Sequence, residues 1–96
     1  MTKCNYDSFM VKPDDSANLA QTTLNQDFNS DGIPAEAKVL NGNVVVAYSS
    51  ECLEDKFYGE ENLETFLAKK GFGKPNADQV KQFEQASWSK GTAVGL

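Results

Sequence analysis

The residues best suited to chemistry lie between positions 27 and 37, in the stretch DFNSDGIPAEA. Carboxylate or amide side chains occupy alternate positions there, at Asp27, Asn29 and Asp31, and Gly32 follows directly. Calcium takes about six to eight oxygen ligands, and calcium loops supply them from alternate side chains, with a glycine at the sharp turn. The same residue types also build polar turns, in which the side chains bond to the local backbone. The spacing therefore predicts either a solvated turn, which is the preferred interpretation, or a calcium site.

Several calcium loops resemble this stretch in part. With Asp27 counted as position 1, it is similar to an EF-hand loop as far as Gly32, but Lys38 stands where that loop has its closing glutamate. It resembles more closely the short DxDxDG loops of bacterial Excalibur-type modules, whose closing glutamate matches Glu36. In FG-GAP repeats an acid is expected at the position of Ala35. The resemblance covers about ten of the 96 residues. The ligand set that it implies is Asp27, Asn29, Asp31 and Glu36.

The second candidate site is a strongly acidic stretch. The whole chain has a net charge of −5, and residues 51–64 alone hold six acids and one lysine, also −5. Residues 1–50 carry −3 and residues 65–96 carry +3, so these two parts cancel. Aromatic side chains surrounded by acids are typical of a protein-binding surface directed at a basic partner, because aromatics supply contact area and the charges steer association. Alternatively, the acids flank a helix N-terminus and the aromatics are core. The predicted partner-binding residues, here named the acidic-aromatic segment, are Glu51, Glu54, Asp55, Phe57, Tyr58, Glu60, Glu61 and Glu64.

Composition excludes several functional classes. All nine cations are lysines, and there is no histidine. The chain therefore lacks the imidazole of most nucleophilic triads and metal sites, and the guanidinium suited to bidentate phosphate binding. Net negative charge also argues against direct nucleic-acid binding. Adjacent carboxylates such as Glu54 and Asp55 seldom converge on one substrate atom, and no nucleophile motif accompanies them. We expect no enzymatic activity, and no cofactor apart from the calcium alternative.

The remaining motifs are unremarkable. Cys4 and Cys52 have no CxxC spacing, so we expect free, largely buried thiols rather than a zinc site. GFGKP at 71–75 lacks the spacing of a phosphate-binding loop. No apolar run approaches the roughly 18–20 residues that span a bilayer, and no secretory signal is visible at the N-terminus. These features predict a cytoplasmic protein without a membrane partner.

A β-hairpin is the clearest of the elements that must position these residues. In AKVLNGNVVVAY, two β-prone runs flank Asn41-Gly42, and both central residues of a type I′ turn need positive φ. We expect strands over 36–40 and 43–49. The second strand is apolar on both faces, so it should be central in its sheet or covered on both sides. One face would hold Val44, Val46 and Tyr48, and the other Val45 and Ala47.

Three amphipathic helices are also predicted. The first covers about 14–25, the second runs through GEENLETFLAKKG, and the third has a capping box formed by Asn76 and Gln79. With a first strand over 3–12, the order is β-α-β-β-α-α. This order predicts an α+β fold: a single domain over 1–96, with a mainly antiparallel sheet packed by helices and a frayed tail over about 90–96.

These features favour a small acidic protein that is not an enzyme and that binds, and thereby inhibits, another macromolecule. The expected partner is a protein or nucleoprotein complex with a basic surface. In size and charge the chain resembles small acidic inhibitors of phages and mobile elements, including anti-CRISPR proteins and DNA mimics, and also bacterial immunity proteins. The alternative is a calcium-binding module built on Asp27, Asn29 and Asp31.

Overall fold

Strand β4 (Asn43–Tyr48) lies at the centre of the sheet that organises the chain. It pairs antiparallel with β2 (Ser8–Pro13) on one side and with β3 (Ala35–Leu40) on the other. Its residues Val44 to Ala47 have no solvent exposure at all. The prediction of a central strand covered on both faces is therefore confirmed. The computed structural model describes residues 4–13, 15–49, 57–58, 61–88 and 91–93.

The predicted hairpin joins β3 to β4. Asn41 and Gly42 both have positive φ, at 52° and 77°, as a type I′ turn requires. The register that follows places Leu40 opposite Asn43 and Ala35 opposite Tyr48. A slip of one residue would turn every β4 side chain to the other face, and both faces are buried, so the turn and the core enforce the same register.

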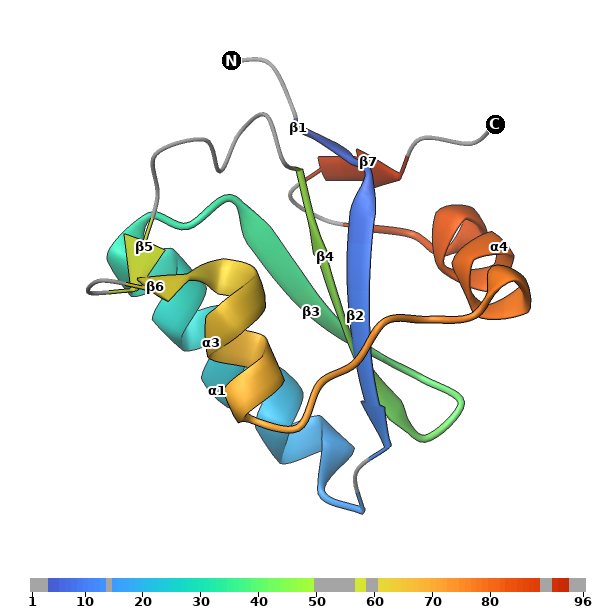
Figure 1. The fold of residues 1–96 in the computed structure, drawn as a ribbon, viewed down its shortest axis with the longest axis horizontal. Helices are drawn as coiled ribbons and strands as arrows, with labels where there is room; N and C mark the ends of the chain where they lie inside the picture. Colours follow the sequence, from blue (N-terminus) through green and yellow to red (C-terminus); the bar gives the residue numbers. More distant parts are fainter. Residues whose placement is uncertain (1–3, 14, 50–56, 59–60, 89–90, 94–96) are drawn as a thin grey trace.

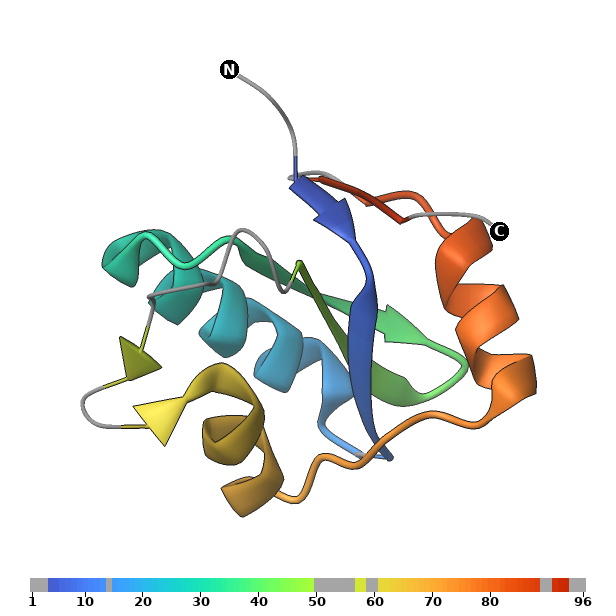
Figure 2. The same ribbon diagram turned by 45° about the horizontal axis from the view of Figure 1, so that its top comes forward.

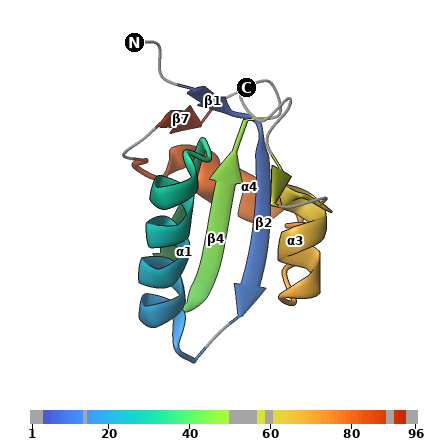
Figure 3. The same ribbon diagram turned by 90° about the vertical axis from the view of Figure 1, so that its left-hand side faces the viewer.

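One face of the sheet is covered by helices α1 (Ala17–Asp31) and α3 (Leu63–Lys69). In Figure 3 this face is turned toward the reader: α1 and α3 flank the strands in front, and the third helix lies behind the sheet. Side chains from both helices and from the sheet join in one core cluster. As predicted, the β4 residues on this face are Val44, Val46 and Tyr48. Leu24, Phe28, Leu63 and Leu67 are the main helical contributors.

The opposite face is covered by α4 (Ala77–Gln85), which lies across the sheet from α1 and α3 in Figure 1. Its core is aromatic. Tyr6 meets the Trp88 ring edge to face, with centroids 5.8 Å apart, and Phe9 lies 5.6 Å from Phe83. The Trp88 indole N–H donates to the Phe83 carbonyl at 2.9 Å, so the polar atom of this buried ring is satisfied. From β4, Val45 and Ala47 complete the cluster.

The helix starts follow capping chemistry. Asn76 and Gln79 form the predicted capping box of α4, with side chain to backbone bonds of 2.8 and 2.9 Å. In α3 the Asn62 carboxamide accepts from the Thr65 N–H at 2.8 Å. This helix therefore begins at Leu63, and the residues GEEN, which the predicted helix included, precede it.

Helix α1 differs from its prediction, because it continues to Asp31 instead of ending near residue 25. Two observations explain the extension. Phe28 lies one turn after Leu24 and is fully buried, so the apolar stripe continues past residue 25. Gly32 adopts the left-handed conformation at φ 67°, and the Ile33 N–H then bonds to the Phe28 carbonyl at 2.8 Å. The stretch that resembled a calcium loop is the last turns of a helix and its glycine stop.

Two small ribbons complete the fold. β1 (Cys4–Tyr6) pairs parallel with β7 (Gly91–Ala93), and Figure 2 shows them side by side above the sheet. β5 (Phe57–Tyr58) pairs antiparallel with β6 (Glu61–Asn62).

The first predicted strand is thus split at Asp7, and residues 91–93 are paired rather than frayed. The α+β class with an antiparallel three-stranded sheet is confirmed. Cys52 lies outside the described residues, so the free thiols stay a prediction.

The outer edge of β3 is closed by side chains from α1. The Asn25 carboxamide bonds to both backbone groups of Ala37, accepting from the N–H at 2.9 Å and donating to the carbonyl at 3.0 Å. The Gln21 amide oxygen accepts from the Val39 N–H at 2.7 Å. An open strand edge is a template for pairing with another chain, so these contacts both hold α1 on the sheet and protect the edge.

We predict that Asn25→Ala lowers the free energy of unfolding by about 1–2 kcal/mol relative to Asn18→Ala, because it removes two hydrogen bonds at a half-buried position. Asn18 is exposed in the same helix, so its replacement carries the same change in helix propensity. Urea denaturation followed by circular dichroism measures both variants. Equal stability of the two would contradict a structural role for Asn25.

Candidate functional site

The predicted calcium ligands are not brought together. Asp27, Asn29 and Asp31 are exposed residues of α1. Successive helical residues are rotated by about 100°, so the Asn29 side chain projects to the other side of the helix from Asp27 and Asp31. In the part of the chain that the structure describes, no group of three or more His, Cys, Asp or Glu side chains could hold a metal ion. Alternation converges ligands in a loop, but it separates them in a helix.

Glu36, the fourth member of the implied ligand set, is a core residue. It lies in β3 with 6% of its surface exposed, and its carboxylate accepts a hydrogen bond from the Tyr6 hydroxyl at 3.2 Å. Its register partner is Ala47, so it faces the aromatic layer under α4. Burial raises the pKa of the Tyr6 hydroxyl, and the nearby Glu36 charge and their hydrogen bond raise it further. The implied ligand set is therefore corrected: Glu36 belongs to a buried pair with Tyr6.

The acidic-aromatic segment is described only in part. Glu51, Glu54, Asp55 and Glu60 lie outside the described residues. The backbone of Phe57 and Tyr58 forms β5, and the register sets Tyr58 opposite Glu61 of β6. Among the eight predicted partner-binding residues, Glu64 is the one whose side-chain contacts are described. The binding role of the segment therefore stays a prediction. Its last residue, Glu64, belongs to α3.

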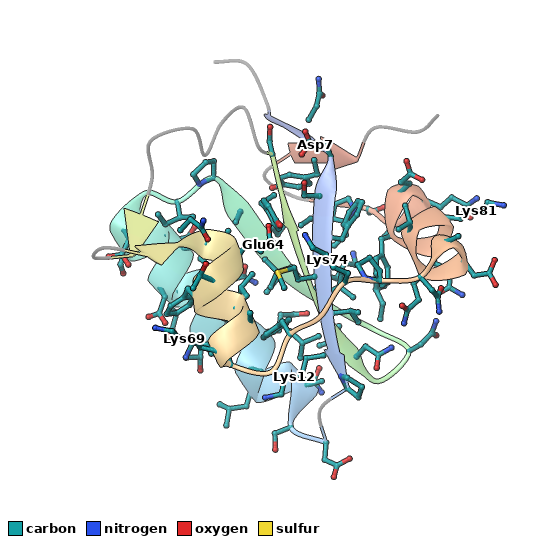
Figure 4. All side chains as sticks on the ribbon, viewed as in Figure 1. Asp7, Lys12, Glu64, Lys69, Lys74 and Lys81 are labelled. Atoms are coloured by element: carbon teal, nitrogen blue, oxygen red, sulfur yellow. The ribbon has the colours of Figure 1, made fainter. Side chains whose placement is uncertain are left out.

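Glu64 lies in the first turn of α3, close to Lys74 and to Tyr48, the last residue of β4. Its carboxylate contacts the Lys74 ammonium at 3.0 Å, and Figure 4 shows the two side chains together near the middle of the molecule. Both are more than half exposed, at 52% and 62%. The hydrogen bond from Lys74 to Glu64 raises the pKa of the lysine. Burial raises the pKa of the neighbouring Tyr48, and the Lys74 charge opposes that rise.

A groove that the sequence did not predict lies along α1. Its volume is about 400 Å³. One wall is a single face of the helix, made by residues spaced three and four apart from Ser16 to Asp27. The facing wall comes from Lys12 of β2 and from Lys70 and Phe72, which follow α3. The sequence does predict the helix that forms this wall, although it places the helix end near residue 25. The groove was not predicted, because no sequence pattern gives the position of residues 70–72 relative to that helix.

The Tyr6–Glu36 pair yields a prediction about pH. The unfolded chain releases a tyrosine proton near pH 10, whereas folded Tyr6 keeps its proton to higher pH. Deprotonation above pH 10 therefore stabilises the unfolded state relative to the folded state. The unfolding free energy should then fall by as much as about 1.4 kcal/mol per pH unit for this one group. Tyr6→Phe should remove that part of the slope. Urea denaturation between pH 8 and 11, with phenolate absorbance recorded in parallel, measures it. Identical slopes above pH 10 would show that Tyr6 titrates normally.

The chain was also compared with known proteins. No protein-family model, curated protein or solved structure matches it significantly. Within the described ranges, no helix has both the length and the apolar character needed to cross a bilayer. Assignment of function therefore rests on the charge, burial and position of this chain's own residues.

Proposed function

We propose that this protein acts by binding, and thereby blocking, a macromolecule with a basic surface, and that the acidic-aromatic segment makes the contact. The observation that carries the proposal is the distribution of charge. Residues 51–64 hold a net charge of −5, which equals that of the whole chain, because the remaining parts cancel. A concentrated charge of this kind steers an oppositely charged partner and raises the rate of association.

The start of α3 supports this proposal. Leu63 and Leu67 are buried in the core, at 3% and 0% exposure, so this helix is held on the sheet by its apolar side. Glu64 is left half exposed at the end of the segment. Its contact with Lys74 is a surface ion pair, which contributes at most about 1 kcal/mol and can be exchanged for a pair with a partner's lysine or arginine.

The buried groups favour binding over catalysis. Tyr6 and Glu36 form a close acid and hydroxyl pair of a kind that enzymes use, but they are only 1% and 6% exposed. A general acid or base must reach the substrate atom within hydrogen-bonding distance, and a pair enclosed in an aromatic layer cannot. The absence of histidine from the sequence removes the most frequent catalytic acid and base.

The proposal is tested by reversing charge in the segment. The variant Glu54→Lys, Asp55→Lys, Glu60→Lys and Glu61→Lys should lose a partner that the wild-type protein captures from a lysate of its native cells. Wild-type capture should weaken as salt is raised, because screening shortens the reach of exposed charges to about 8 Å at physiological ionic strength.

The matched control reverses four acids outside the segment, at Asp15, Asp31, Asp78 and Glu84. Each set of four reversals changes the net charge from −5 to +3, so a difference between the variants reports position and not total charge. Circular dichroism and thermal melting establish that both variants fold. Capture that survives reversal of the segment with unchanged sensitivity to salt would refute the proposal.

A further inference from the structure

The groove along α1 has an apolar floor. Leu24 and Phe72 are buried beneath it, at 5% and 7% exposure, and Ala20 is partly buried beside them. At its margin stands Leu19, which is 68% exposed and is the one large hydrophobic side chain with that much exposure among the described residues. Exposed leucine surface gains roughly 25 cal/mol for each Å² that a ligand removes from water. The groove therefore offers contact to an apolar body.

The rim of the groove carries more positive than negative charge. Lys12 and Lys70 line it together with one acid, Asp27, in a chain whose net charge is −5. Each lysine lies next to a neighbouring group of the protein. The Lys12 chain lies along the connection after α3, where its Cε would be 3.4 Å from a Cβ at Gly71. The Lys70 ammonium lies 4.9 Å from the Phe66 ring centre.

The connection that carries Lys70 and Phe72 is itself fixed to the sheet. Val11 and Gly73 exchange two backbone hydrogen bonds, each of 2.9 Å, so the wall facing α1 is tied to β2. The other wall, α1, is tied to β3 by Asn25 and Gln21. Both walls are therefore anchored to the same sheet, and the groove is preformed. Preformed sites bind more tightly because little ordering is needed when the ligand enters.

We propose that this groove binds a small amphipathic monoanion: an apolar body that lies on Leu19, Leu24 and Phe72, with one carboxylate between the two lysines. A volume of about 400 Å³ falls within the range of roughly 300–1,000 Å³ typical of small-ligand sites. The groove residues lie outside positions 51–64, so the two proposals rest on different residues.

The test uses three probes that differ in one feature each. Amide NMR spectra of the wild-type protein are recorded during titration with 4-phenylbutyrate, with its neutral amide 4-phenylbutyramide, and with butyrate, which lacks the ring. We expect saturable shifts at Leu19, Thr23 and Phe72 for 4-phenylbutyrate, with binding about two- to fivefold weaker for the amide. Butyrate should give no saturable shifts there.

Variants locate the charge requirement. Lys70→Gln should weaken 4-phenylbutyrate binding about two- to fivefold. Lys81→Gln is the matched control, because this lysine is exposed on α4, away from Lys12 in Figure 4, and its replacement should leave binding unchanged. Should Lys70→Gln fail to fold, the comparison of acid and amide on the wild-type protein still decides. The proposal is overturned if no groove resonance saturates, if the amide binds as tightly as the acid, or if the two variants weaken binding equally.

Discussion

The whole structure depends on the burial of β4 on both faces. Four successive residues, Val44 to Ala47, are fully removed from water, so the strand needs an apolar layer on each side. A 96-residue chain can supply those layers only with short amphipathic elements, because each helix has a single apolar stripe. Two helices cover one face and an aromatic cluster under α4 covers the other. Flanking strands satisfy the backbone of β4 on both sides. The sheet then has two outer edges to protect, and the chain treats them differently.

The two edges determine where binding surfaces can form. At β3, side chains from α1 take the outward backbone groups, which leaves polar contacts and no template for another strand. At β2, the connection after α3 bonds to Val11 and carries Lys70 and Phe72 along the sheet. The groove is thus a by-product of protecting the second edge. In sequence, the acidic-aromatic segment begins after β4 and ends at Glu64, in the first turn of α3. We propose that the acidic-aromatic segment binds a basic macromolecule and that the groove binds a small anion.

Local chemistry explains which predictions succeeded. The hairpin at Asn41-Gly42 and the capping box of α4 depend on neighbouring residues alone, and both are confirmed. The predicted end of α1 was wrong because helix stops and calcium loops both use a glycine with positive φ. The sequence DFNSDG therefore fits both structures. What distinguishes them is the burial of Phe28, which depends on the distant sheet. The pairing of β1 with β7 and the groove join residues far apart in sequence, and no local pattern reports such contacts. The charge of the acidic-aromatic segment is read directly from the sequence, whereas its role in binding stays a prediction.

Native-state amide hydrogen exchange tests most directly the claim that β4 holds the structure together. Backbone N–H groups of a strand that is paired on both sides and buried on both faces should exchange only when the whole molecule unfolds. Val44, Val45 and Val46 should therefore exchange slowest, with free energies equal to that of global unfolding measured in urea. The amides of β1 and β7, which form a separate two-stranded ribbon, should exchange faster through local opening. Exchange of the β4 amides at a free energy well below global unfolding, or no slower than those of β1, would contradict the account.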